Sequence, residues 1–277
     1  MTSFNPFHAI LGSLVAALAF SGAAIAATPT APVPHGTVTL VSETTSLASQ
    51  HENWIGLLFL LEPGWHTYWA NPGDAGIAPK ITWKLPPGFQ AGAIVWPVPQ
   101  RLPVGKLIDF GYEKDVTLLV PVRGAANAAP ASAAEISAQL SVLVCKDLCI
   151  PGKAAVSLSI PVKATPPVPS NQNAPIFAAA RSHLPKPLPA GSKVTATESK
   201  NEFLLSAETV KQSAHAFFFP LEQSQIDNVA PQPADRIDKG VRLHLKKSPD
   251  LRQPLTRLRG VLDLDGTGYQ VDAPMTR

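Results

Sequence analysis

The sequence predicts an all-β protein with two β-sandwich domains in tandem. Pro (29) and Gly (18) are frequent among the 277 residues and spread widely, as in chains of short strands joined by turns. Helix signals are few, and the best is 174–184, ended by Pro185. Apolar and polar residues alternate with period two, as in antiparallel sheets with one buried face, over 37–42, 136–144, 155–162, 241–245 and 258–264.

Further segments set the domain organisation. The apolar runs 54–61 and 217–219 are of strand length. Residues 163–173 are rich in Pro, Ser and Asn, which indicates a linker between a domain over 30–162 and a second over 174–277. The low-complexity stretch 125–134 is expected to be a solvated loop of the first domain.

The N-terminus predicts export. No charged side chain precedes Glu43, and the apolar run 9–20 is shorter than the roughly 20 residues that a membrane span needs. Ala24-Ile25-Ala26 has the small-x-small form of a signal-peptidase site, so 1–26 is expected to be a signal peptide cleaved after Ala26. The cysteines would then meet an oxidising compartment.

The charge and the absence of certain motifs argue against several classes of function. The net charge is +3, from 23 Lys+Arg against 20 Asp+Glu without a basic cluster, so we expect no nucleic-acid partner. There is no nucleophile elbow, phosphate-binding glycine loop or dinucleotide fingerprint, and no cofactor is expected.

Cys145 and Cys149 are the two cysteines, and the sequence places them at the tip of a hairpin. The alternating runs on either side predict its strands, and Lys146, Asp147 and Pro151 suit its turn. A structural disulfide of so small a ring would contribute only about 2 kcal/mol. Reversible thiol–disulfide exchange is therefore the first interpretation, with a structural disulfide or a soft metal ion as alternatives.

The segment 64–76, GWHTYWANPGDAG, is the second feature that stands out. Its aromatic residues either anchor the sandwich core or form a cap or docking surface beside the cysteines. The candidates for that surface are Trp65, His66, Tyr68, Trp69, Asp74 and, from a second aromatic segment, Tyr112.

These motifs together resemble the periplasmic N-terminal region of DsbD-type thiol:disulfide interchange proteins, in particular the suppressor-of-copper-sensitivity B (ScsB) subgroup. The resemblance covers nearly all of the chain beyond the signal segment. It is carried by GWHTYWANPGDAG (64–76), ITWKLPPGF (81–89), IVWP (94–97), FGYEKDVTLLVPV (110–122), VCKDLCIPG (144–152), FFFP (217–220), VAPQ (229–232) and LRGVLDLDGTGYQVDAP (258–274).

The resemblance implies immunoglobulin-like domains and a periplasmic electron carrier. Its reduced cysteine pair would pass reducing equivalents to thioredoxin-like or disulfide isomerase-type proteins, with Cys149 as the attacking thiol. Family members continue into a membrane domain and a thioredoxin-like domain, whereas this sequence stops at Arg277. A separate membrane electron transporter is therefore the expected donor. The alternative is a non-enzymatic periplasmic adaptor or a copper-binding accessory protein.

Overall fold

The computed structural model describes residues 28–208 and 213–276, together with Met1. Over these residues the chain forms nineteen strands and one helix, which confirms the predicted all-β fold. No helix in these ranges is long and apolar enough to cross a membrane. The predicted signal peptide lies outside the described residues.

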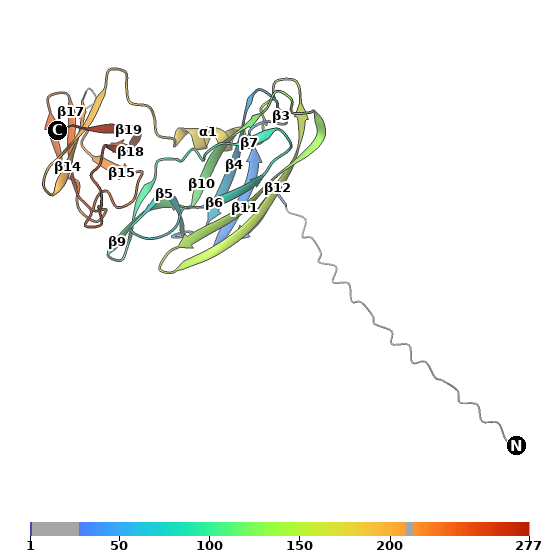
Figure 1. The fold of residues 1–277 in the computed structure, drawn as a ribbon, viewed down its shortest axis with the longest axis horizontal. Coiled ribbons are helices and arrows are strands. Elements are labelled where there is room, and N and C mark those ends of the chain that lie inside the picture. Colours follow the sequence, from blue (N-terminus) through green and yellow to red (C-terminus); the bar gives the residue numbers. More distant parts are fainter. Residues whose placement is uncertain (2–27, 209–212, 277) are drawn as a thin grey trace.

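The first unit contains two sheets around one core (Figure 1). In the smaller sheet β4 is central, and its alternating side chains Leu57 and Phe59 are fully buried. The strand order is β1 (Thr30–Val33), β2 (Gly36–Ser42), β4 (Glu52–Leu61), β10 (Asp115–Gly124) and β7 (Phe89–Ala91).

The larger sheet carries the cysteine hairpin. Its order is β3 (Leu47–Ala48), β12 (Cys149–Lys163), β11 (Ala131–Cys145), β5 (His66–Gly73), β9 (Leu107–Glu113) and β8 (Gln100–Val104), with β6 (Lys80–Lys84) also paired to β11. The expectation of a loop over 125–134 is wrong in its second half, because β11 already begins at Ala131. There Ala131 and Ala134 pair with Val162 and Ile160, so β12 provides hydrogen-bonding partners even for this low-complexity segment.

The second unit is one seven-stranded sheet that folds around its own core. Phe203, Phe218 and Leu262 are fully buried in that core. A short parallel pairing of β13 with β19 joins the two halves of the sheet. The strand order is β15 (Ala216–Pro220), β18 (Arg257–Leu264), β19 (Thr267–Thr276), β13 (Lys193–Glu198), β14 (Glu202–Glu208), β17 (Gly240–Lys246) and β16 (Ala234–Ile237).

The helix α1 (Ala174–Ser182) packs on the first unit, although the sequence assigned its residues to the second. Phe177 is 1% exposed and lies in a cluster with Val41 and Leu119 of the first unit. Before the helix, Asn173 donates a hydrogen bond to the Ser42 carbonyl at 2.8 Å. The segment between the units is therefore held against the first sandwich.

Phe219 of β15 joins the two units. Its ring is 4% exposed and belongs to the core cluster of the first unit, where it meets Trp69 and Phe110. The ring centroids lie 6.4 Å from Trp69 and 5.2 Å from Phe110, both in edge-to-face arrangements. Such pairs add to the stabilisation that burial alone provides. The second unit thus contributes a side chain to the core of the first.

We predict that Phe219→Ala lowers the free energy of unfolding by about 3–5 kcal/mol, because it leaves a cavity between Trp69 and Phe110. Urea unfolding followed by tryptophan fluorescence measures the loss. Phe217→Ala is the matched control. Because the neighbouring Phe217 ring is only half-buried, its removal should lower the free energy of unfolding by less. Equal losses in the two variants would contradict the role given to Phe219.

Candidate functional site

The two cysteines close the end of the β11–β12 hairpin, as the sequence predicts. They form the last pair of a ladder whose preceding pair is Val144 with Ile150. Their Cα atoms are 4.1 Å apart and a disulfide joins them. In the turn, the Lys146 N–H donates to the Leu148 carbonyl at 3.3 Å. The backbone itself therefore holds the two sulfurs together.

The two sulfurs differ in access to solvent. Cys145 is fully buried, whereas Cys149 is exposed and follows Leu148, which is 68% exposed. Thiol–disulfide exchange requires an incoming thiolate to reach one sulfur of the disulfide while the other leaves. Of the two sulfur-bearing side chains, only that of Cys149 is exposed to such an approach.

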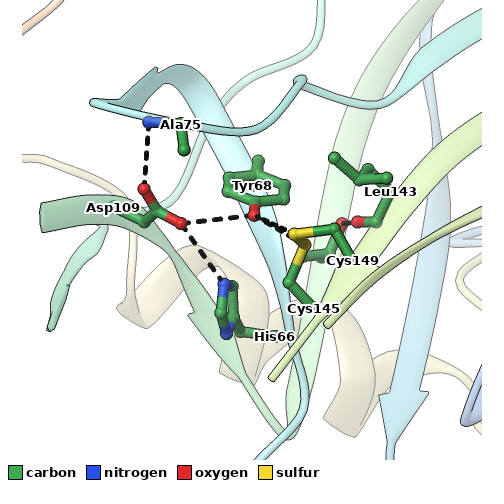
Figure 2. The surroundings of a disulfide bond; sticks show 8 residues. His66, Tyr68, Ala75, Asp109, Leu143, Cys145 and Cys149 are labelled. Atoms are coloured by element: carbon green, nitrogen blue, oxygen red, sulfur yellow. Dashed lines mark hydrogen bonds and ion pairs between the residues drawn. A yellow bond between two sulfur atoms is a disulfide. The ribbon is translucent and has the colours of Figure 1, made fainter. Parts of the chain in front are cut away.

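Tyr68 provides the polar contact to the buried sulfur. It lies on β5 two residues after His66, which pairs with Cys145 of β11. Figure 2 shows the Tyr68 hydroxyl pointing at the disulfide, with its oxygen 2.7 Å from Cys145 Sγ and 3.6 Å from Cys149 Sγ. Since a phenol O–H can donate to sulfur, Tyr68 is placed to support negative charge on Cys145.

Asp109 of β9 is the second acceptor for the Tyr68 hydroxyl. Its Oδ2 lies 3.2 Å from Tyr68 Oη, and its side chain is 1% exposed. Burial of the phenol, and then the negative charge and hydrogen bond of Asp109, raise the pKa of Tyr68 above its usual value. Tyr68 therefore keeps its proton at neutral pH and can donate it either to the carboxylate or to a developing thiolate.

His66 completes this buried polar group. Its Nε2 lies 3.8 Å from Asp109 Oδ2, which is ion-pair distance but too long for a hydrogen bond. The ring also meets Tyr68 edge to face, with centroids 5.3 Å apart. Figure 2 shows dashed lines from the same Asp109 oxygen to Tyr68 and to His66.

The turn that follows β5 packs against the same residues. The Ala75 N–H donates to Asp109 Oδ1 at 3.1 Å. Gly76 has φ +92°, and a Cβ on it would lie 2.1 Å from the Tyr68 ring. Only glycine therefore allows the turn to approach the phenol this closely.

The six residues proposed from the sequence as a cap or docking surface occupy different environments. Tyr68 and His66 lie beside the disulfide, as described above. Trp65 is half-buried and stacks on His35 at 3.6 Å between ring centroids, and Asp74 is exposed. Trp69 and Tyr112 are 2% and 5% exposed and belong to the core cluster, so their assignment to a docking surface is corrected: both are core residues. Both side chains lie on the buried face of their strand. For Trp69 this agrees with the alternative interpretation, in which the aromatic residues of 64–76 anchor the sandwich core. His66 and Tyr68, at 3% and 0%, are also too buried to form an outer surface, and they lie behind the disulfide.

Asp109 was not among the site residues predicted from the sequence. A signal was present, because this acid interrupts the otherwise apolar segment 107–112, LIDFGY. A carboxylate inside a buried strand needs hydrogen-bonding partners, which makes it a candidate for a site. Its proximity to the cysteines depends on the pairing of β5 with β9, which spacing alone does not reveal.

Within residues 28–208 and 213–276, no group of three or more His, Cys, Asp or Glu side chains is arranged to hold a metal ion.

Known proteins resemble this chain in sequence and in fold. The sequence model of the family described as "Thiol:disulfide interchange protein DsbD, N-terminal" matches residues 37–161, which include both cysteines, Tyr68 and Asp109. Among solved structures, the N-terminal periplasmic domain of ScsB from Proteus mirabilis matches with a TM-score of 0.63 at 20% identity. The match covers 90% of this chain and 98% of that one, and shows a shared, immunoglobulin-like fold. No curated protein matches the chain.

We predict that Tyr68→Phe slows reduction of the disulfide by dithiothreitol at pH 7 about tenfold. The hydrogen bond that supports the leaving Cys145 sulfur is lost, and bonds to charged groups contribute about 1.5–3 kcal/mol. Quenching with N-ethylmaleimide and counting alkylated thiols by mass gives the rate. Tyr269→Phe, which alters a half-buried tyrosine of the second unit, is the control. An unchanged rate in Tyr68→Phe would contradict the role of its hydroxyl.

Proposed function

Because residues 37–161 belong to the DsbD N-terminal family, we propose that the protein is a periplasmic thiol–disulfide exchange protein. It would pass reducing equivalents to oxidised periplasmic proteins through Cys145 and Cys149. The observation that carries the proposal is the asymmetry of the disulfide: an exposed Cys149 is backed by a buried Cys145 that receives a hydrogen bond from Tyr68.

In the forward direction the reduced pair attacks a disulfide of the partner. The Cys149 thiolate bonds to one partner sulfur, and the other partner sulfur leaves and takes up a proton. Cys145 then loses its proton and attacks Cys149 Sγ, which releases the first partner sulfur as a thiol. The partner gains two electrons and two protons, and the Cys145–Cys149 disulfide of the present structure is formed.

Re-reduction runs the same steps backwards. A donor dithiol attacks the exposed Cys149 Sγ, and Cys145 leaves as a thiolate in a buried site. Burial disfavours that charge, and the Asp109 carboxylate disfavours it further. The Tyr68 hydroxyl, which keeps its proton, offsets both effects by turning its hydrogen bond toward the sulfur.

The surface around Cys149 suits a protein partner. A groove of about 550 Å³ lies beside the hairpin, lined in part by Leu143 and Pro151. These two residues form a pair two positions along the ladder from the cysteines. Ile77, at the edge of the groove, and Leu148, at the hairpin tip, are 57% and 68% exposed. We propose that thioredoxin-like or disulfide isomerase-type proteins dock here, and that a separate membrane transporter supplies electrons.

The cysteine variants test the proposal. Cys145→Ser keeps the exposed thiol but removes the resolving one, so it should trap a covalent adduct with oxidised protein disulfide isomerase. This model partner has a potential of about −180 mV, at the oxidising end of the range expected for the pair. Cys149→Ser keeps only the buried thiol and should trap at least about tenfold less, because that sulfur is out of reach. Non-reducing gels and intact mass measure the adduct.

The wild-type protein is the reference for this experiment, since it should reduce the isomerase without accumulating the adduct. Circular dichroism checks that both variants keep the fold. The proposal fails if both variants still reduce the isomerase as the wild type does, or if neither traps it.

The reduction potential of the pair gives an independent test. We predict a value between about −180 and −270 mV, the range of exchange catalysts. Equilibration in graded glutathione or dithiothreitol buffers, followed by alkylation and mass measurement, determines it. A value below about −300 mV is typical of structural disulfides and would instead indicate a static bond.

A further inference from the structure

The second unit contacts the segment 71–76, which comprises the end of β5 and the turn that follows it. Asn71, near the end of β5, is 1% exposed, and its Nδ2 donates to the carbonyls of Pro220 at 2.8 Å and Glu222 at 3.3 Å, both in the second unit. Its Oδ1 accepts from the Gly73 N–H at 3.0 Å, which shapes the turn. One buried amide therefore ties the turn to the second unit.

A second hydrogen bond between the units is made at Asp74, three residues after Asn71. Asn228, which is 7% exposed, donates from Nδ2 to Asp74 Oδ1 at 2.9 Å. The other oxygen of Asp74 accepts from the Ile108 N–H at 2.8 Å. The carboxylate thus bridges the second unit and strand β9, directly before Asp109.

From there a short path leads to the sulfur. Ala75, the residue after Asp74, donates its N–H to Asp109 Oδ1, and Asp109 Oδ2 meets the Tyr68 hydroxyl. That hydroxyl lies 2.7 Å from Cys145 Sγ. Continuous hydrogen bonds and one peptide step therefore connect Asn228 to the leaving sulfur.

We propose that the second unit is a positioning element of the redox site, in which Asn228 holds the 71–76 turn so that Asp109 and Tyr68 stay aligned on Cys145. This inference rests on the exchange function proposed above and assigns a role in it to the second unit. Asn228 touches no reacting atom, so it acts through Asp74 and Tyr68.

The packing on the opposite faces of the same strands supports this assignment. Tyr68 of β5 faces the disulfide, and the next residue, Trp69, faces Phe219 of the second unit. On β9, Asp109 faces the site and Phe110 faces Phe219. Successive residues of a strand point to opposite faces, so the second unit supports both site strands from the core side.

The test is the rate at which dithiothreitol reduces the disulfide at pH 7. We expect Asn228→Ala to slow it about threefold to tenfold, since small misplacements of catalytic groups cost up to about a hundredfold. Asn228→Asp keeps the size of the side chain but sets a like charge against Asp74, and should slow the rate at least as much. Arg101→Ala is the interface control: it removes a guanidinium that lies over the Phe217 ring and does not contact the turn.

A double variant separates positioning from general loosening. If Asn228 acts through Tyr68, adding Asn228→Ala to Tyr68→Phe should leave the rate of the Tyr68→Phe variant unchanged within about twofold. Circular dichroism and urea unfolding establish that each variant is folded under the assay conditions. The inference is overturned if Asn228→Ala is reduced at the wild-type rate, if its effect multiplies with that of Tyr68→Phe, or if Arg101→Ala slows the rate equally.

The outcome is independent of the partner, because the reductant is a small dithiol. A wild-type rate in Asn228→Ala, together with normal trapping by Cys145→Ser, would remove the positioning role and leave the exchange function standing. A slowed rate in Asn228→Ala without any protein trapping would leave the coupling between the units and remove the exchange function.

Discussion

The structure depends on the alternation of side chains along two paired strands, β5 and β9. Each strand gives one residue to the polar group beside the disulfide: Tyr68, which contacts the sulfurs, or Asp109, which contacts Tyr68. The next residue of each strand, Trp69 or Phe110, lies in the core. The same two peptide segments therefore define the reactive site and the joint between the units. A shift of one residue in either strand would exchange the two faces, so packing in the core fixes the register of the site.

The chemistry follows from unequal environments of two bonded sulfurs. Cys149 lies at the surface of the hairpin tip, and Cys145 lies behind it against Tyr68. A symmetric disulfide could be opened at either sulfur, whereas in the proposed exchange the direction of opening is set by access. The Tyr68 hydroxyl has two acceptors within reach, the Asp109 carboxylate and the Cys145 sulfur.

The sequence predicted much of this and failed where contacts cross between distant segments. Alternating runs located β2, β11, β12, β17 and β18, and the turn residues placed the cysteines at a hairpin tip. Alternation reveals that a strand has a buried face but not which segment covers it, so the docking of α1 and the insertion of Phe219 were not predicted. The roles of Asp109 and Asn228 depend on such contacts. Asp109 is 41 residues away in sequence from its partner Tyr68, and Asn228 is 154 residues away from its partner Asp74. The burial of Trp69 and Tyr112 was likewise left open, because the composition of a segment does not show which face of its strand is covered.

The pairing of β11 with β12 continues up to the cysteines, and this bears on the lifetime of a mixed disulfide with a partner. The paired backbone around Val144 and Ile150 does not need the S–S bond to stay in register. The two sulfurs therefore remain neighbours when the bond is open, and closure of a mixed disulfide is an intramolecular step at high effective concentration. In the proposed exchange a partner would be released soon after it is captured, which suits a rapid relay of electrons and not a lasting covalent complex.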